Sequence, residues 1–243
     1  MKVLTSKDIK MLKRFCVFTP TELTNFFRVV CLKLGYKEED MHYKKDCYFY
    51  IKGDDKYPTL VAHIDTVRVR NLGNYDEFFY DSEERVLWCP ELAGFDDRAG
   101  VYAIYKLITE TDYKPSIILF DREEIGGKGA VQFCSDFKRE EIKTKYFIEM
   151  DRQGYCESVY YLCDNPAFEN FINYFGFSTA KGIFSDVYLL GPVYDTASVN
   201  LSIGYLDEHT LAERLYLDWF EETFVKVKKM LEVTEATPYF KHH

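Results

Sequence analysis

Two adjacent glutamates at the end of an apolar stretch constrain this chain more than any other feature of the sequence. Residues 119–130 read LFDREEIGGKGA, so an apolar strand is followed by Glu123 and Glu124 and then by glycines that lead into a helix. Neighbouring residues of an extended segment point in opposite directions, so one carboxylate can face a metal ion while the other faces a water molecule. A solvated acidic turn is the ordinary alternative. Further metal ligands at other strand ends would argue against it.

The order of the other segments predicts an α/β domain. Apolar stretches at residues 48–51, 59–65, 116–121, 145–151, 158–163 and 198–205 indicate strands, with a weaker one at 86–89. Helical patterns cover residues 6–18, 19–35, 101–110, 166–176 and 211–231, and another helix follows Gly129. Strand, helix and strand in succession is typical of a parallel sheet. We therefore expect a three-layer α/β/α fold around a mixed, mostly parallel sheet.

Length and charge limit the organisation and the partners. The chain has 243 residues and no linker, repeat or low-complexity run, which favours a single domain over residues 1–243. Its formal charge is -9 and it has no long basic tract, so a nucleic-acid partner is not expected.

Cysteine usage and hydropathy indicate a cytoplasmic protein. The seven cysteines are odd in number and include no CxxC pair, which is typical of free thiols in a reducing compartment. Charged residues occupy the start of the chain where a signal peptide needs an apolar core, and no apolar run is long enough to span a membrane.

Five segments place metal-type ligands at what would be one edge of the sheet. His63, Glu123 and Glu124, Asp151 and His209 lie at or just past strand ends, and Asp96-Asp97 opens a helix. Ligands of open α/β sheets gather at the carboxyl ends of the strands. Two imidazoles and three carboxylates, without thiolate, suit a pair of zinc ions, or cobalt or manganese. His42 is left over, and we interpret it as a surface loop residue.

The same segments resemble a known group of enzymes. The pattern His63-Ile64-Asp65-Thr66, the sequence GFDDRAG at 94–100, the segment around Glu123, the strand-end Asp151 and NLSIGYLDEHT at 200–210 occur together and in order. Together they resemble the co-catalytic dizinc exopeptidases, the clan of the M20, M28 and M42 aminopeptidases, carboxypeptidases and deacylases. The resemblance covers roughly residues 59–213.

That resemblance implies a role for each residue. Asp96 would bridge the two ions, and its peptide bond to Asp97 would be cis. His63 and Asp151 would bind one ion, and Glu124 and His209 the other. Asp65 would accept a hydrogen bond from the far ring nitrogen of His63 and so orient it. Glu123 would be the general base that moves a proton from water to the leaving amine.

The chain also departs from the family pattern. Asp121 stands where a hydroxyl residue is usual, and it could raise the pKa of Glu123 if it faces the site. The segments between His63 and Asp96 and between Asp151 and His209 are too short for an inserted domain, so the layout is nearest to a lid-less M28 enzyme. An orienting role for Asp97 stays open. Ser185-Asp186 resembles a Ser-Asp pair found in parts of the family, and a helix cap is the alternative at that position.

These observations predict a dinuclear metallohydrolase that cleaves a terminal amide bond of a small peptide, as an aminopeptidase does. An acidic, open site suits the free ammonium group of such a substrate, by analogy with the family. An N-acyl amino acid amidohydrolase with the same metal centre is the second possibility. A metal-binding interaction module without activity is the third, and the presence of Glu123 argues against it.

Overall fold

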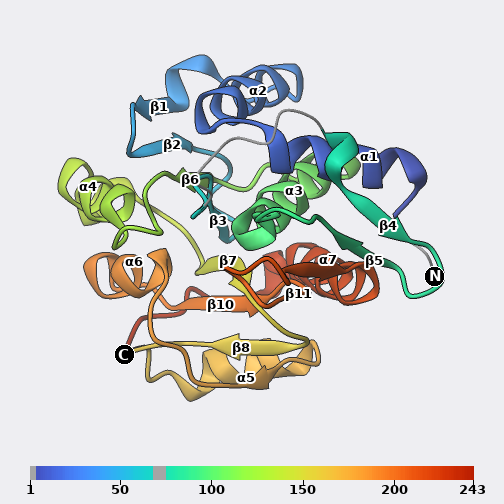
Figure 1. The fold of residues 1–243 in the computed structure, drawn as a ribbon. Helices are drawn as coiled ribbons and strands as arrows, with labels where there is room; N and C mark the ends of the chain where they lie inside the picture. Colours follow the sequence, from blue (N-terminus) through green and yellow to red (C-terminus); the bar gives the residue numbers. More distant parts are fainter. Residues whose placement is uncertain (1–3, 68–74) are drawn as a thin grey trace.

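The computed structural model describes residues 4–67 and 75–243 (Figure 1). The predicted domain spans residues 1–243, so its residues 1–3 and 68–74 lie outside the described part. The helices are α1 (Ser6–Val17), α2 (Pro20–Lys33), α3 (Phe95–Glu110), α4 (Lys128–Asp136), α5 (Pro166–Tyr174), α6 (Asp186–Tyr194) and α7 (Leu217–Glu232). Short 3-10 turns lie at Glu38–Asp40, Tyr75–Glu77, Arg139–Glu141 and Thr234–Ala236.

The strands form two sheets. They are β1 (Met41–Lys44), β2 (Tyr48–Ile51), β3 (Thr59–His63), β4 (Phe79–Asp81), β5 (Val86–Trp88), β6 (Ile117–Phe120), β7 (Phe147–Arg152), β8 (Glu157–Val159), β9 (Ser178–Thr179), β10 (Ser198–Ser202), β11 (Tyr205–Leu206) and β12 (Arg214–Tyr216). The large sheet has the order β1-β2-β6-β3-β7-β10-β8-β9, and the small one has the order β11-β12-β5-β4.

The centre of the large sheet is parallel. Strands β6, β3, β7 and β10 are neighbours and run in the same direction, while β1, β2 and β8 pair antiparallel with their neighbours on the two flanks. The mixed, mostly parallel sheet expected from the sequence is therefore confirmed.

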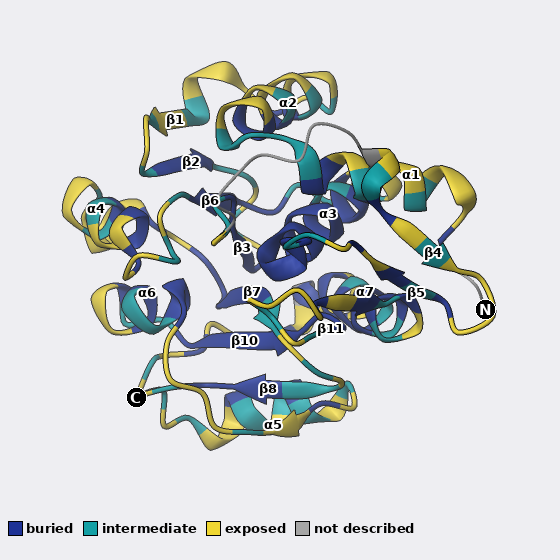
Figure 2. Cartoon of the chain, in the orientation of Figure 1, coloured by how far each residue is buried: buried dark blue, intermediate teal, exposed yellow. Residues whose placement is uncertain are grey.

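Helices cover both faces of this sheet and make three layers (Figure 1). Alternate residues of a strand point to opposite faces. Leu60 and Ala62 of β3 accordingly pack in a core with residues of α1, α3 and α7, whereas Val61 packs in a second core with Phe133 of α4 and Leu190 of α6. Figure 2 shows that α3 is buried along most of its length, since it lies between β3, β7 and α1.

Local signals in the sequence explain how the first helices begin. Thr5 and Thr19 each accept a hydrogen bond from the backbone N–H three residues later, and the carboxylates of Asp8 and Glu22 accept the return bond. These are capping boxes, and α2 also has Pro20 at its first position, where no N–H is needed. The predicted start of α2 is confirmed.

Several predicted boundaries were wrong. The strand expected at 59–65 ends at His63, so Asp65 belongs to the following loop. The helix expected from residue 211 begins only at Leu217, because residues 214–216 form β12 and pair with β5. Helix α6 was not predicted, since its sequence DVYLLGPVY is apolar on all sides and contains Pro192. His42 is exposed, as expected, but it lies in β1 rather than in a loop.

Among the described residues, no helix is both long enough and apolar enough to cross a lipid bilayer.

Candidate active site

The predicted site residues converge at the carboxyl ends of the parallel strands. In the register of β3 and β7, Val61 lies beside Glu149. His63 and Asp151, each two residues further on, therefore reach the same level of the sheet. Glu123 and Glu124 follow β6, the neighbour of β3 on its other side. The sheet topology thus brings together residues that lie far apart in the sequence.

The first group of possible metal ligands is buried. The Nε2 atom of His63 lies 2.9 Å from Oδ1 of Asp96 and 3.4 Å from Oδ1 of Asp151. All three ligand atoms lie within 4.8 Å of one another. The His63 side chain has no exposed surface. This spacing is suitable for three atoms that surround a single ion.

The second group lies nearer the surface. The Nε2 atom of His209 lies 3.0 Å from Oδ2 of Asp96 and 3.0 Å from Oε2 of Glu124. These ligand atoms also lie within 4.8 Å of one another. The His209 side chain is 47% exposed, because the loop between β11 and β12 carries it outside the large sheet.

Asp96 belongs to both groups and uses a different oxygen in each. Its Oδ1 atom faces His63 and its Oδ2 atom faces His209. A carboxylate in this position can bridge two ions, and the four other side chains leave one imidazole and one carboxylate for each ion. Such a set of oxygen and nitrogen donors fits zinc, cobalt or manganese.

Backbone geometry at the start of α3 holds Asp96 in place. The Asp96–Asp97 peptide bond is cis, as the family resemblance implies. Gly94 precedes the helix with a φ of 69°, a conformation that glycine adopts without steric conflict. The Glu213 carboxylate accepts hydrogen bonds from the N–H groups of Gly94 at 2.6 Å and Asp96 at 3.0 Å.

Asp97 has a positioning role within the backbone. It is fully buried, and its carboxylate accepts hydrogen bonds from the N–H groups of His63 at 3.2 Å and Gly100 at 2.9 Å. A side chain at Gly100 would meet the Met150 carbonyl oxygen at 2.6 Å. The missing side chain therefore lets α3 approach β7 closely.

Asp65 contacts both the first histidine and the glutamate pair. Its Oδ1 atom lies 3.4 Å from Nδ1 of His63, the ring nitrogen that faces away from Asp96 and Asp151. The same carboxylate accepts hydrogen bonds from the N–H groups of Glu123 at 3.1 Å and Glu124 at 3.2 Å. The sequence predicted a hydrogen bond between Asp65 and this ring nitrogen, but the two groups are only in ion-pair contact and Nδ1 has no hydrogen-bond partner among the described residues. The two bonds to the backbone were not predicted.

Glu123 lies beside the ligands without belonging to either group. Its Oε2 atom is 4.0 Å from Nε2 of His63. Burial raises the pKa of Glu123, and the negative charges of Asp96 and Asp65 act in the same direction, although His63 opposes them. A carboxylate with a raised pKa is a better proton acceptor in a catalytic step near neutral pH.

The two histidines stabilise the charge of Asp96, whereas the carboxylates repel one another. Burial acts to raise the pKa of Asp96, but hydrogen bonds from His209 and His63 outweigh it and lower that pKa. The hydrogen bond to Asp96 raises the pKa of His209 to about 9. Burial, together with the charge of Asp96, raises the pKa of Glu124 to about 7.

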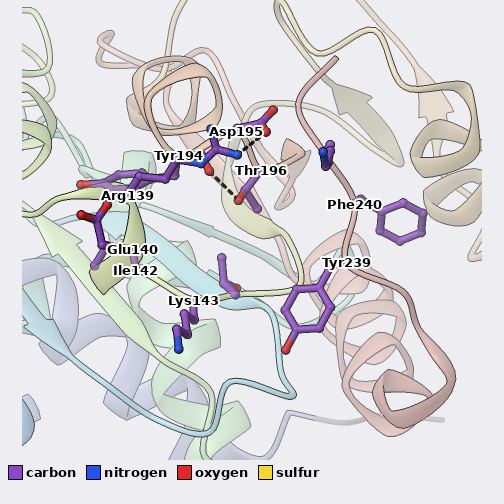
Figure 3. A pocket seen from close by; sticks show the side chains of 11 residues that line it. Arg139, Glu140, Ile142, Lys143, Tyr194, Asp195, Thr196, Tyr239 and Phe240 are labelled. Atoms are coloured by element: carbon purple, nitrogen blue, oxygen red, sulfur yellow. Dashed lines mark hydrogen bonds and ion pairs between the residues drawn. The ribbon is translucent and has the colours of Figure 1, made fainter.

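The site opens into a cavity of about 430 Å³. Glu123 and the ligands other than His63 line this cavity. Lys181, Ile183 and Phe184 also line it, and they come from the loop between β9 and α6. A second cavity of about 440 Å³ lies at the opposite edge, near the starts of β7 and β10, where Arg139 pairs with Asp195 (Figure 3). None of the predicted site residues lines that second cavity.

Three residues that position the site were not assigned from the sequence. The side chain of Asn200 bonds to both the N–H group of Asp151, at 2.9 Å, and its carbonyl oxygen, at 2.8 Å. The Tyr205 hydroxyl donates to Oδ1 of Asp151 at 3.1 Å. Both residues belong to the NLSIGYLDEHT segment, which was a signal for them. Glu213 had no such signal, because its partners, Gly94 and Asp96, lie at the distant start of α3.

Two open questions from the sequence concern acidic residues near the site. Asp121 lies at a separate small pocket together with Tyr43 and Cys47, so it does not line the main cavity. Ser185 precedes α6, but its side chain makes no capping hydrogen bond. Asp186 follows it and is completely buried.

No protein-family model and no curated protein matches the chain. Several solved structures have a similar fold. They include a tripeptidase from Staphylococcus aureus (10% identity, 97% of this chain and 100% of that chain covered, TM-score 0.74). They also include the aminopeptidase PepT from Bacillus cereus (12%, 96% and 100%, 0.71) and an aminopeptidase from the archaeon Desulfurococcus kamchatkensis (14%, 95% and 97%, 0.63). The chain has the fold of these peptidases. At such low identities the likeness concerns the fold.

Proposed function

We propose that this protein is a metal-dependent hydrolase that cleaves a terminal amide bond of a small peptide. The main support is the position of Asp96, whose two carboxylate oxygens each face a different histidine at about 3 Å. The fold shared with a tripeptidase and two aminopeptidases supports the same class of reaction. The lid-less, M28-like layout stays a prediction.

The ligand set would hold two divalent ions, with zinc favoured over cobalt and manganese. His63 and Asp151 would hold one ion, Glu124 and His209 the other, and Asp96 would contact both. Bound ions of this kind polarise a carbonyl oxygen and lower the pKa of water toward neutrality.

The side chains of the chain itself would then handle the proton. Glu123 faces the cavity beside His63, so it would accept a proton from the attacking water and deliver it to the nitrogen of the leaving amine. The carboxylate of Asp65 accepts a hydrogen bond from the N–H group of Glu123 and so fixes the backbone of Glu123. This contact keeps the base at a constant distance from the first histidine.

An unblocked peptide is the favoured substrate class. The wall of the cavity includes several acidic side chains, among them Glu208. Such a wall favours a free ammonium group over a neutral acyl group by direct attraction. An N-acyl amino acid amidohydrolase is the alternative, and a metal-binding module without activity is the third.

Metal analysis combined with substrate comparison tests this proposal. We expect about two zinc ions per chain, and fewer in the His63→Ala and His209→Ala variants, measured on protein without the terminal His242 and His243. Unblocked dipeptides should be cleaved, and their N-acetylated forms should not. The reverse preference would establish the amidohydrolase. A chain that neither contains nor binds zinc would refute the mechanism.

A further inference from the structure

Behind the candidate active site lies a second group of acidic residues that the proposed reaction does not use. Glu149 is on β7, and Ser185 and Asp186 stand at the start of α6. All three side chains are completely shielded from solvent. The Oε2 atom of Glu149 accepts a hydrogen bond from the N–H group of Val187 at 3.2 Å, so this carboxylate reaches the first turn of α6.

Most of the oxygen atoms in this group have no hydrogen-bond partner among the described residues. They are Oε1 of Glu149, Oγ of Ser185, and both Oδ1 and Oδ2 of Asp186. Buried polar groups in native proteins are nearly always paired, and a buried unpaired charge is particularly unfavourable. A partner that carries positive charge would satisfy these four oxygens, which belong to residues that meet at the start of α6.

The backbone brings the three residues together. Val187, whose N–H group donates to Glu149, directly follows Ser185 and Asp186 at the start of α6. Strand β7 and helix α6 pack against each other, so Glu149 and Asp186 lie at one junction of the fold.

We propose that Glu149, Ser185 and Asp186 bind a hard monovalent cation, Na⁺ or K⁺. The four free donor atoms are all oxygens, which select a hard ion over zinc. Magnesium retains several waters, which a fully buried group does not provide. The start of α6 supplies about half a positive charge, so a single positive charge on the ion nearly completes the balance with two carboxylates.

A cation at this position offsets negative charge behind Glu123. It also connects β7, which carries Asp151, to α6, which lies against β10. This role is independent of the peptidase proposal, because it requires neither the five ligands nor any turnover.

The test is thermal unfolding of the full chain at constant ionic strength, in sodium or potassium chloride and in tetramethylammonium chloride, whose cation is too large to be enclosed. Each comparison is made with zinc and with a chelator, because the predicted zinc ligands also attract cations. We expect Na⁺ or K⁺ to raise the unfolding midpoint saturably, by about 2–4 °C or more.

Asp186→Asn is the decisive variant, since it keeps the shape and removes one charge. It should lose the response to Na⁺ and K⁺ and be more stable than the wild type in tetramethylammonium chloride. Asp164→Asn, a change of the same kind at an exposed position, should respond as the wild type does. A rubidium-soaked crystal should show an anomalous peak between Glu149 and Asp186.

Two results would overturn the proposal. If the wild type unfolds at the same temperature in all three salts, the carboxyl groups share a proton instead of a cation. If Asp186→Asn responds to Na⁺ and K⁺ as the wild type does, the ion binds elsewhere. Both results are read from unfolding, so they stand whether or not the protein hydrolyses peptides.

Discussion

The Glu213 carboxylate holds the backbone of Asp96 through a hydrogen bond of 3.0 Å to its N–H group. Because Asp96 faces both histidines, Glu213 influences both ligand groups without contacting either ion position. Glu213→Ala should therefore weaken zinc binding at both sites, by about 10–100-fold, as is usual when a residue supporting a metal ligand is removed. Competition with a chromophoric chelator measures this change.

Glu140→Ala serves as the control, because Glu140 is exposed and lines the other cavity. Equal zinc affinity in Glu213→Ala and the control would show that Asp96 keeps its place without Glu213.

Glu123 and Glu124 are adjacent and chemically identical, yet their substitution by glutamine should have different effects. Glu123→Gln should retain its zinc and lose about 10²–10⁴-fold in kcat, because only the proton acceptor is removed. Glu124→Gln should lose one zinc ion, since its carboxylate lies 3.0 Å from His209. Metal content and turnover, measured on both variants, distinguish the proton acceptor from the metal ligand. Loss of metal from Glu123→Gln would assign it to the ligands instead.

Zinc binding should release protons at neutral pH. The hydrogen bond to Asp96 raises the pKa of His209 from its ordinary 6.5 to about 9, so the imidazole of the metal-free protein is protonated at pH 7. A metal ligand must be neutral. The apparent zinc affinity should thus rise with pH between 7 and 9, by about tenfold per pH unit for each proton released.

The raised pKa of His209 has the opposite consequence for the metal-free protein, whose stability should fall as the pH rises. Since the pKa of His209 is higher in the folded state, its pairing with Asp96 stabilises the protein fully below pH 6.5, and this stabilisation is lost as the pH rises through about 9.

The proton release on zinc binding is measured by calorimetric titration in buffers of different ionisation enthalpy. A proton count of zero at pH 7 would contradict the prediction.

Gly100 is the position in α3 where any side chain should be harmful. A Cβ atom there would lie 2.3 Å from Oδ1 of Asp97 and 2.6 Å from the Met150 carbonyl oxygen. Gly100→Ala should reduce the free energy of unfolding by about 1–3 kcal/mol, because the added methyl group forces α3 away from β7. Denaturation by urea measures this loss.

Gly126→Ala is a useful comparison, since a Cβ atom at Gly126 meets no atom within 4 Å. It tests only the cost of the left-handed backbone at φ +94°, about 1 kcal/mol. Gly100→Ala should also weaken zinc binding, whereas Gly126→Ala should leave the affinity within twofold. Equal effects of the two variants on zinc binding would argue against the proposed spacing.

The centre of the fold was predictable because its signals are local. Strands β3, β6 and β7 are short, mainly apolar runs with polar residues at or just past their ends, and parallel strands place such ends on one edge. The small sheet was not predictable in this way. Its strands contain only two or three residues each, and β12 forms by pairing with the distant β5.

The same distinction between local signals and contacts over long distances in the sequence applies to the candidate site. His63, Asp96, Glu124, Asp151 and His209 could be proposed as ligands from the sequence, because ligand-type side chains stand out next to strand and helix ends, and the structure brings these five together. The contacts of Glu213 with Asp96 and of Asp65 with the Glu124 backbone join residues that are distant in sequence. The type of residue gives no indication of such contacts, which depend on how the loops fold over one another.

The position of His209 on the hairpin of β11 and β12 gives the two halves of the site unequal rigidity. His63 is enclosed by the sheet and α3, whereas His209 is 47% exposed and is carried by two short strands. We therefore expect the hairpin to be displaced more easily than the elements that carry His63, Asp96 and Asp151. Loading of the pair would then be sequential: the enclosed position fills first and empties last, and the outer ion is the exchangeable one.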